Sequence, residues 1–203
     1  MESDDGTVCI CYNGEIYNFR KIRKILEDCG HRFKSTTDTE VVLKAYLQWG
    51  TECLEQFVGM FAFAIWDNRN QILFLARDRL GIKPLYYYFN ESEGVLIFSS
   101  ELKALMVFGN FAKEVNPDAI PLFLHYQYIP APGTIFKNTY KLLPGHFLIY
   151  DGGNVKSKEY WESPKIQEIQ INPQHNEEEQ LQRLDDLLTE AVSDRLISDV
   201  PLG

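Results

Sequence analysis

The sequence predicts an α+β fold in which two antiparallel β-sheets are layered between helices, an α/β/β/α sandwich. Two hairpin patterns point to antiparallel pairing, one at 60–66 and 71–76 and one at 85–89 and 95–99. The strands of the first hairpin are apolar on both faces, which favours a sheet covered on each side. Regularly alternating β and α units are absent from the sequence, so a doubly wound parallel sheet is disfavoured.

The first predicted element is a strand over Val8–Tyr12 that ends at the turn-forming pair Asn13-Gly14. A helix over Phe19–Cys29 follows, with Asn18 as its N-cap and a glycine beyond its end. Together these segments predict a strand–turn–helix unit.

A short strand is expected at His31–Lys34, before a second helix that runs to Trp49. Either Thr37 or Asp38 suits the N-cap of that helix, and the glycine after Trp49 suits its end. Residues 51–57 are expected to form a further short helix. The first hairpin then follows, with a polar turn at 67–70.

Beyond the second hairpin, helices are predicted over 101–108 and 116–128. In the second of these, Asn116 is expected to cap the helix because proline follows it at the first helical position. A strand at 146–150 and a glycine-rich turn at 151–154 then lead to a last strand.

The end of the chain reads as a polar linker over 163–176 followed by a helix over Glu178–Ile197. Apolar residues recur along this helix at steps of three and four, at Leu181, Leu184, Leu188, Val192 and Leu196. The sequence after the helix offers nothing for this stripe to pack against, so we expect that further layers of the parent protein are missing.

Composition excludes several classes of protein. The chain has 203 residues, of which 45% are hydrophobic, enough to bury a core. Its net charge of -9 disfavours a nucleic-acid partner. The sequence contains no run of about 20 apolar residues and no basic leader before an apolar run. We therefore expect a cytoplasmic protein with no membrane association.

The four cysteines show no metal-binding spacing, and no metal site is predicted. Cys9 and Cys11 alternate in the first strand, where we expect buried and chemically inert thiols. Cys29 and Cys53 lie apart from them. Neither strand cysteine has a neighbouring histidine in sequence to act as a base, so neither is expected to be a nucleophile.

Two short segments are candidates for chemistry. Asn13 and Gly14 offer a side-chain amide and a backbone N–H to a developing oxyanion, although an ordinary Asn-Gly turn is the simpler alternative. Asp38 either caps its helix or, if it faces the same pocket, binds the α-ammonium of an amino acid. The charged segment 77–85 favours a structural ion-pair corner. The sequence contains no glycine-rich phosphate loop.

Five segments, taken in order, resemble the glutaminase domain of bacterial glutamine-hydrolysing asparagine synthetases, which are class II glutamine amidotransferases. They are Asn13–Asn18, Thr37–Val41, Gly59–Ala64, Arg77–Tyr86 and Ser100–Ala104. The resemblance extends from about Asp5 to Trp161, and Leu142–His146 and Arg195–Gly203 also fit it. It implies an N-terminal nucleophile hydrolase fold, with a glutaminase domain at 1–162 and, at 163–203, a linker and the first helix of an ATP-dependent synthetase domain.

The resemblance also assigns residues. Asn13 and Gly14 match the oxyanion hole, Glu15 matches a position that contacts glutamine, and Asp38 matches the carboxylate that binds the α-amino group of glutamine. The family's nucleophile is a cysteine at the mature N-terminus, whereas this chain begins Met1-Glu2-Ser3. The family's early arginine also has no counterpart. We therefore expect a chain that lacks the first strands and the nucleophile, and that is inactive alone.

For the parent protein the resemblance implies hydrolysis of L-glutamine to glutamate and ammonia. The ammonia would then serve ATP- and Mg²⁺-dependent amidation of aspartate to asparagine at a site outside this chain, in what is expected to be a homodimer. Two alternatives remain open at this point: a non-catalytic glutaminase-like binding module, and an amidotransferase of the same family with a different acceptor.

Overall fold

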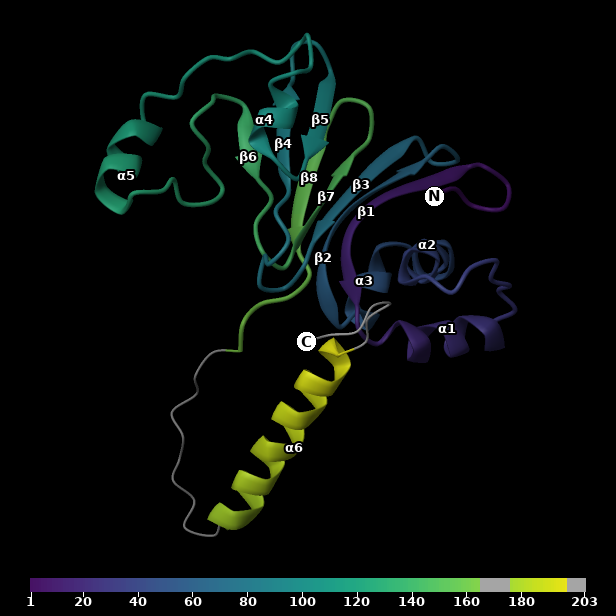
Figure 1. The fold of residues 1–203 in the computed structure, drawn as a ribbon. Helices are drawn as coiled ribbons and strands as arrows, with labels where there is room; N and C mark the ends of the chain where they lie inside the picture. The colour runs from purple at the N-terminus through teal and green to yellow at the C-terminus, as the bar shows by residue number, and fades with distance from the viewer. Residues whose placement is uncertain (165–175, 197–203) are drawn as a thin grey trace. The chain divides into compact units, whose positions relative to one another are not determined.

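The computed structural model describes residues 1–164 and 176–196 of the chain. The chain divides into two compact units, Met1–Glu162 and Ser163–Gly203. The first unit has helices, a five-stranded sheet, a three-stranded sheet and a further short helix as successive layers (Figure 1). The predicted α/β/β/α arrangement is therefore present in this unit.

The larger sheet is antiparallel throughout and has the strand order β1-β2-β3-β7-β8. Its strands are β1 (Val8–Ile16), β2 (Gly59–Asp67), β3 (Ile72–Arg77), β7 (His146–Tyr150) and β8 (Val155–Glu159). The predicted hairpin of β2 and β3 is confirmed. The predicted end of the first strand at Asn13-Gly14 is wrong, because β1 continues to Ile16 and pairs with β2 along its whole length, with Asn13 opposite Ala62 and Gly14 opposite Phe61.

One face of this sheet is covered by a helical layer (Figure 1). It comprises α1 (Phe19–Asp28), α2 (Asp38–Trp49), the 3₁₀ turn η1 (Gly50–Glu52) and α3 (Cys53–Gln56). Alternate residues of β1, including Val8, Ile10 and Ile16, pack with apolar residues of α1 and α2 in one buried cluster. Because side chains alternate across a strand, Cys9, Cys11, Asn13 and Glu15 are directed to the other face.

Two local predictions in this layer are wrong. Residues 31–34 form no strand. Asn18 makes no side-chain cap of α1. Its amide instead donates to the Gln56 carbonyl at 2.8 Å and accepts from the Val58 N–H at 3.0 Å. Asn18 therefore ties the end of β1 to the start of β2 rather than capping a helix.

The smaller sheet has the order β5-β4-β6, with β4 (Tyr86–Asn90), β5 (Val95–Ser99) and β6 (Thr139–Lys141). A second apolar cluster lies between the two sheets and joins Ala62, Ala64 and Leu75 to residues such as Leu85 and Phe98. The opposite face of the smaller sheet packs against α4 (Leu102–Leu105) in a third cluster. The β4–β5 hairpin was predicted, whereas β6 was not.

The segment predicted as an ion-pair corner is instead satisfied by the main chain. The Asp78 side chain is 1% exposed, and its carboxylate accepts from the N–H groups of Phe61, Leu80, Ile82 and Lys83. The neighbouring guanidinium of Arg77 donates to three carbonyl oxygens, those of Gly81, Lys83 and Leu142. This corner connects β3 of one sheet to β4 of the other.

The remaining helices are α5 (Ala119–Tyr126) and, in the second unit, α6 (Glu177–Arg195). The helix predicted from Asn116 begins later, although the Asn116 side chain does accept from the Asp118 N–H. In α6, Asn176 is the cap, and the predicted apolar stripe is exposed within the described residues. Most of the predicted linker at 163–176, and Ile197, lie outside the described residues.

Candidate active site at the end of strand β1

The outer edge of β1 is covered at one end and open at the other. The Ile10 N–H donates to the Met1 carbonyl, and the Ile10 carbonyl accepts from the N-terminal ammonium at 2.9 Å. Both main-chain groups of Ile10 therefore point away from β2. In an antiparallel pair this direction repeats at every second residue, so the N–H groups of Tyr12, Gly14 and Ile16 face the same outer edge. Gly14 thus has a backbone donor that the sheet does not use.

Gly14 also lies unusually close to the neighbouring strand. A Cβ at this position would be 2.3 Å from the Met60 carbonyl oxygen and 2.6 Å from the Phe61 Cα. The same close approach occurs at Gly59, where a Cβ would be 2.1 Å from the Glu15 carbonyl oxygen. Because main-chain atoms cause both clashes, a side-chain movement cannot relieve them. Glycine is therefore required for β1 and β2 to cross as closely as they do.

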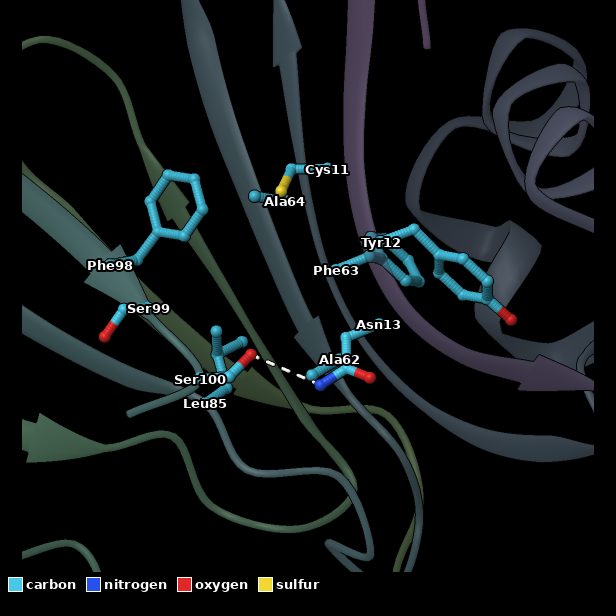
Figure 2. A pocket seen from close by; sticks show the side chains of 10 residues that line it. All are labelled: Cys11, Tyr12, Asn13, Ala62, Phe63, Ala64, Leu85, Phe98, Ser99 and Ser100. Carbon is cyan, nitrogen blue, oxygen red and sulfur yellow. Dashed lines mark hydrogen bonds between the residues drawn. The ribbon is translucent and has the colours of Figure 1, made fainter. Parts of the chain in front are cut away.

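The Asn13 side chain lines a cavity of about 260 Å³ between the two sheets. The cavity is lined by Cys11, Tyr12, Asn13, Ala62, Phe63, Ala64, Leu85, Phe98, Ser99 and Ser100. Figure 2 shows the Asn13 amide pointing toward Ser100, and Asn13 Nδ2 donates to Ser100 Oγ at 3.3 Å. Apart from this amide and the hydroxyls of Tyr12, Ser99 and Ser100, the lining side chains are largely apolar. The cavity thus places one amide donor in a weakly polar setting.

Asp38 approaches β1 from the helical side. Its Oδ2 accepts from the Tyr12 hydroxyl at 2.7 Å and from the Ile16 N–H at 3.0 Å. Oδ1 accepts no hydrogen bond from the described residues. Burial, reinforced by the bond to Asp38, raises the pKa of Tyr12 above its ordinary value. The structure therefore joins Asp38 to the strand that carries Asn13 and Gly14.

Asp38 is not the cap of α2. The cap is Thr37, whose side chain accepts from the Glu40 N–H, and Asp38 is the first helical residue. Asp38 is also absent from the lining of the inter-sheet cavity, because it lies on the opposite side of β1 from the Asn13 side chain. The Asp38 carboxylate and the Gly14 N–H lie at the same outer edge of β1, because Asp38 accepts from the Ile16 N–H, two residues beyond Gly14.

The segment leading to Asp38 is held by a buried carboxylate that sequence reasoning did not assign. Glu40 is 5% exposed and accepts from the N–H groups of Lys34 and Ser35 and from the Ser35 hydroxyl. Burial opposes ionisation, but these hydrogen bonds lower the pKa of Glu40 below its ordinary value. The buried ammonium of Lys44 lies 3.8 Å from the same carboxylate. This network fixes the start of α2.

Glu15 extends from the same face of β1 as Asn13 and is exposed. Its carboxylate forms no hydrogen bond or ion pair with the described residues. Glu15 is thus a charged group at the cavity side of the strand without a protein partner there, and its assigned contact with glutamine stays a prediction.

The prediction of two buried strand cysteines is wrong. Cys9 is half-buried, while Cys11 is exposed and lines the cavity two residues before Asn13. Strand alternation placed them on one face, but that face opens toward the inter-sheet cavity. The buried thiol is Cys53, whose pKa is raised by burial. No histidine lines the cavity, so the structure offers Cys11 no base there.

Within 1–164 and 176–196, no group of three His, Cys, Asp or Glu residues is placed to hold a metal ion. No helix in those ranges is both long and apolar enough to cross a bilayer.

Comparison with known proteins identifies relatives over the whole chain. Residues 1–161 match the family described as glutamine amidotransferase domain. A putative glutamine-hydrolysing asparagine synthetase 2 of Methanocaldococcus jannaschii is 38% identical over 100% of this chain and 38% of its own length. The glutamine-hydrolysing asparagine synthetase 3 of Bacillus subtilis is 35% identical over 97% of this chain and 31% of its own length. The chain therefore spans less than two fifths of these relatives.

The fold is also found in a solved structure. Glutamine phosphoribosylpyrophosphate amidotransferase from B. subtilis superposes with a TM-score of 0.56 over 80% of this chain and 31% of its own, at 20% identity. At that identity the likeness concerns the fold alone, and it confirms the predicted N-terminal nucleophile hydrolase type of α+β sandwich.

Proposed function

We propose that this chain, which belongs to the glutamine amidotransferase domain family, is the glutaminase part of a glutamine-hydrolysing asparagine synthetase. In this role the protein hydrolyses L-glutamine to glutamate and ammonia, and the ammonia is used to amidate aspartate. The family match and the two asparagine synthetase relatives support the proposal.

The observation that carries the proposal is the arrangement along the open edge of β1. The Gly14 N–H and the Asn13 amide are donors suited to the oxyanion that forms when the glutamine amide carbon is attacked. Asp38 is bound at Ile16, two residues further on, which along a strand is about 7 Å. Its Oδ1 is suited to the α-ammonium of a glutamine whose side-chain amide lies at Gly14.

A second reaction centre has no proposed ligands in this chain. The described residues include neither a glycine-rich phosphate loop nor a carboxylate cluster that fits Mg²⁺. ATP and Mg²⁺, which the amidation of aspartate requires, are therefore proposed to bind elsewhere in the protein, and no step is assigned to them at the residues described.

The test uses the complete polypeptide that the gene encodes. Asn13→Ala is expected to lower glutamine turnover about a hundredfold or more with a modest change in KM, because it removes a transition-state contact. Ammonia-dependent asparagine synthesis should be unchanged. Asn110→Ala is the matched control, since Asn110 is exposed and outside the cavity. Equal glutamine turnover in the two variants would remove Asn13 from the reaction.

A further inference from the structure

A hydrogen bond between the two sheets acts directly on the proposed oxyanion donor. Asn13 belongs to β1 of the larger sheet, whereas Ser100 follows β5 of the smaller sheet, 87 residues further along the chain. Figure 2 shows the bond from Asn13 Nδ2 to Ser100 Oγ at the cavity between the sheets. No other hydrogen bond of the Asn13 side chain with the described residues is found.

The chemistry of the amide makes this bond consequential. A side-chain amide has two N–H donors on one nitrogen, in a fixed plane. When one N–H is bound to Ser100 Oγ, the rotation of that plane is restricted and the direction of the second N–H is set. An oxyanion hole depends on donors that are oriented before the reaction begins. Without Ser100, the exposed Asn13 amide is free to turn about its terminal torsion.

The adjacent serine does something different. Ser99, the last residue of β5, also lines the cavity, but its hydroxyl donates to the nearby Glu101 carbonyl. Only Ser100 of the two reaches across to Asn13. The pair therefore offers a test residue and a matched control of the same chemical type, one position apart.

We propose that Ser100 is a positioning residue for glutamine hydrolysis, which orients the Asn13 amide as an oxyanion donor across the gap between the two sheets. The inference rests on the proposed glutaminase function and adds to it a residue to which no role was assigned. Ser100 acts through Asn13 and is not itself placed against the reacting atoms.

The experiment measures glutaminase and ammonia-dependent synthesis in the complete encoded polypeptide. Ser100→Ala is expected to lower the kcat for glutamine about threefold to tenfold, the range that one net hydrogen bond is worth. KM should stay within about twofold, because the bond acts in the transition state. Ser100→Thr, which keeps a hydroxyl, should restore kcat. Asn110→Ala, which lies outside the cavity, should match the wild type, whereas Ser99→Ala should lower kcat less than Ser100→Ala because Ser99 makes no bond to Asn13. All variants should keep ammonia-dependent synthesis as evidence of folding.

The double variant decides how Ser100 acts. If Ser100 works through Asn13, adding Ser100→Ala to Asn13→Ala should lower kcat no further. Additive losses, or an unchanged kcat for Ser100→Ala alone, overturn the inference while leaving the glutaminase proposal intact. An unchanged kcat for Asn13→Ala also overturns the inference and removes Asn13 from the reaction, whereas the absence of glutamine hydrolysis in the wild-type polypeptide would overturn the glutaminase proposal, so the two failures are distinguishable.

Discussion

Replacing Asp38 by asparagine should separate a structural role from a substrate-binding role. The Asp38 Oδ2 accepts from the Tyr12 hydroxyl and the Ile16 N–H. A hydrogen bond to a charged acceptor is worth about 1 kcal/mol more than one to a neutral acceptor. Two such bonds give an expected loss of about 2 kcal/mol in the free energy of unfolding for Asp38→Asn. Urea unfolding of the 203-residue chain measures this loss.

In the complete encoded polypeptide the same variant should also weaken glutamine binding. If Oδ1 is the partner of the substrate ammonium, its neutralisation leaves that charge unpaired and costs about 2–5 kcal/mol in affinity. Tyr12→Phe is the matched control. It removes the 2.7 Å bond to Oδ2 but leaves the carboxylate charge in place. It should lower stability by about 1 kcal/mol and leave the KM for glutamine unchanged.

The two measurements can contradict the reasoning separately. Unchanged stability in Asp38→Asn would show that the carboxylate does not hold β1 to α2. A stability loss with an unchanged KM would show that Asp38 is only a structural connection, and its assignment to the α-ammonium would be wrong.

Three further predictions concern the chain itself. Gly14→Ala should lower stability by about 1–3 kcal/mol, because the added Cβ meets the Met60 carbonyl, and an unchanged urea midpoint would contradict so close a crossing of β1 and β2. Burial raises the pKa of Tyr46, so this tyrosine ionises at a lower pH in the unfolded chain than in the folded one. Its contribution to the free energy of unfolding is therefore complete below about pH 10 and is lost as the pH rises further. Tyr46→Phe should reduce that loss, as measured by urea unfolding at a series of pH values. Phe123 on α5 is 51% exposed and should promote self-association of the chain. In analytical ultracentrifugation, Phe123→Glu should therefore sediment closer to the monomer than the control Lys113→Glu. Equal sedimentation of the two variants would show that Phe123 is not part of a self-association surface.

The sequence predicted best those elements whose pattern is long and regular. The β2–β3 hairpin and α2 were expected within a few residues of their observed bounds, because their apolar patterns are supported by clear turn and cap residues. The strand β6 was missed because three residues on the edge of a sheet are too few to show a period.

Errors near the candidate site have a common physical cause. Asn13-Gly14 has the composition of a turn, but pairing with β2 carries the strand through it to Ile16. Local propensity also suggested that Asn18 and Asp38 cap helices, whereas tertiary hydrogen bonds to Val58 and Tyr12 occupy both side chains. Such long-range partners have no local signal in one sequence.

The residues that sequence reasoning left without a role were also the distant partners. Ser100 appeared in a family-like segment, yet its bond to Asn13 joins positions 87 residues apart. Glu40 appeared in another, and only the fold shows that its carboxylate holds Lys34 and Ser35. A homologous alignment showing covariation would be a signal capable of finding them.

In the corner around Asp78, the shape of the loop depends on main-chain groups and not on the side chains that point outward from it. The carboxylate is held by main-chain N–H groups, and two of these belong to Leu80 and Ile82, whose side chains are 71% and 54% exposed. Every amino acid except proline supplies the same donor. Evolution is therefore free to change the outward side chains at both positions, for example to suit a new neighbour, while the junction between the two sheets keeps its geometry.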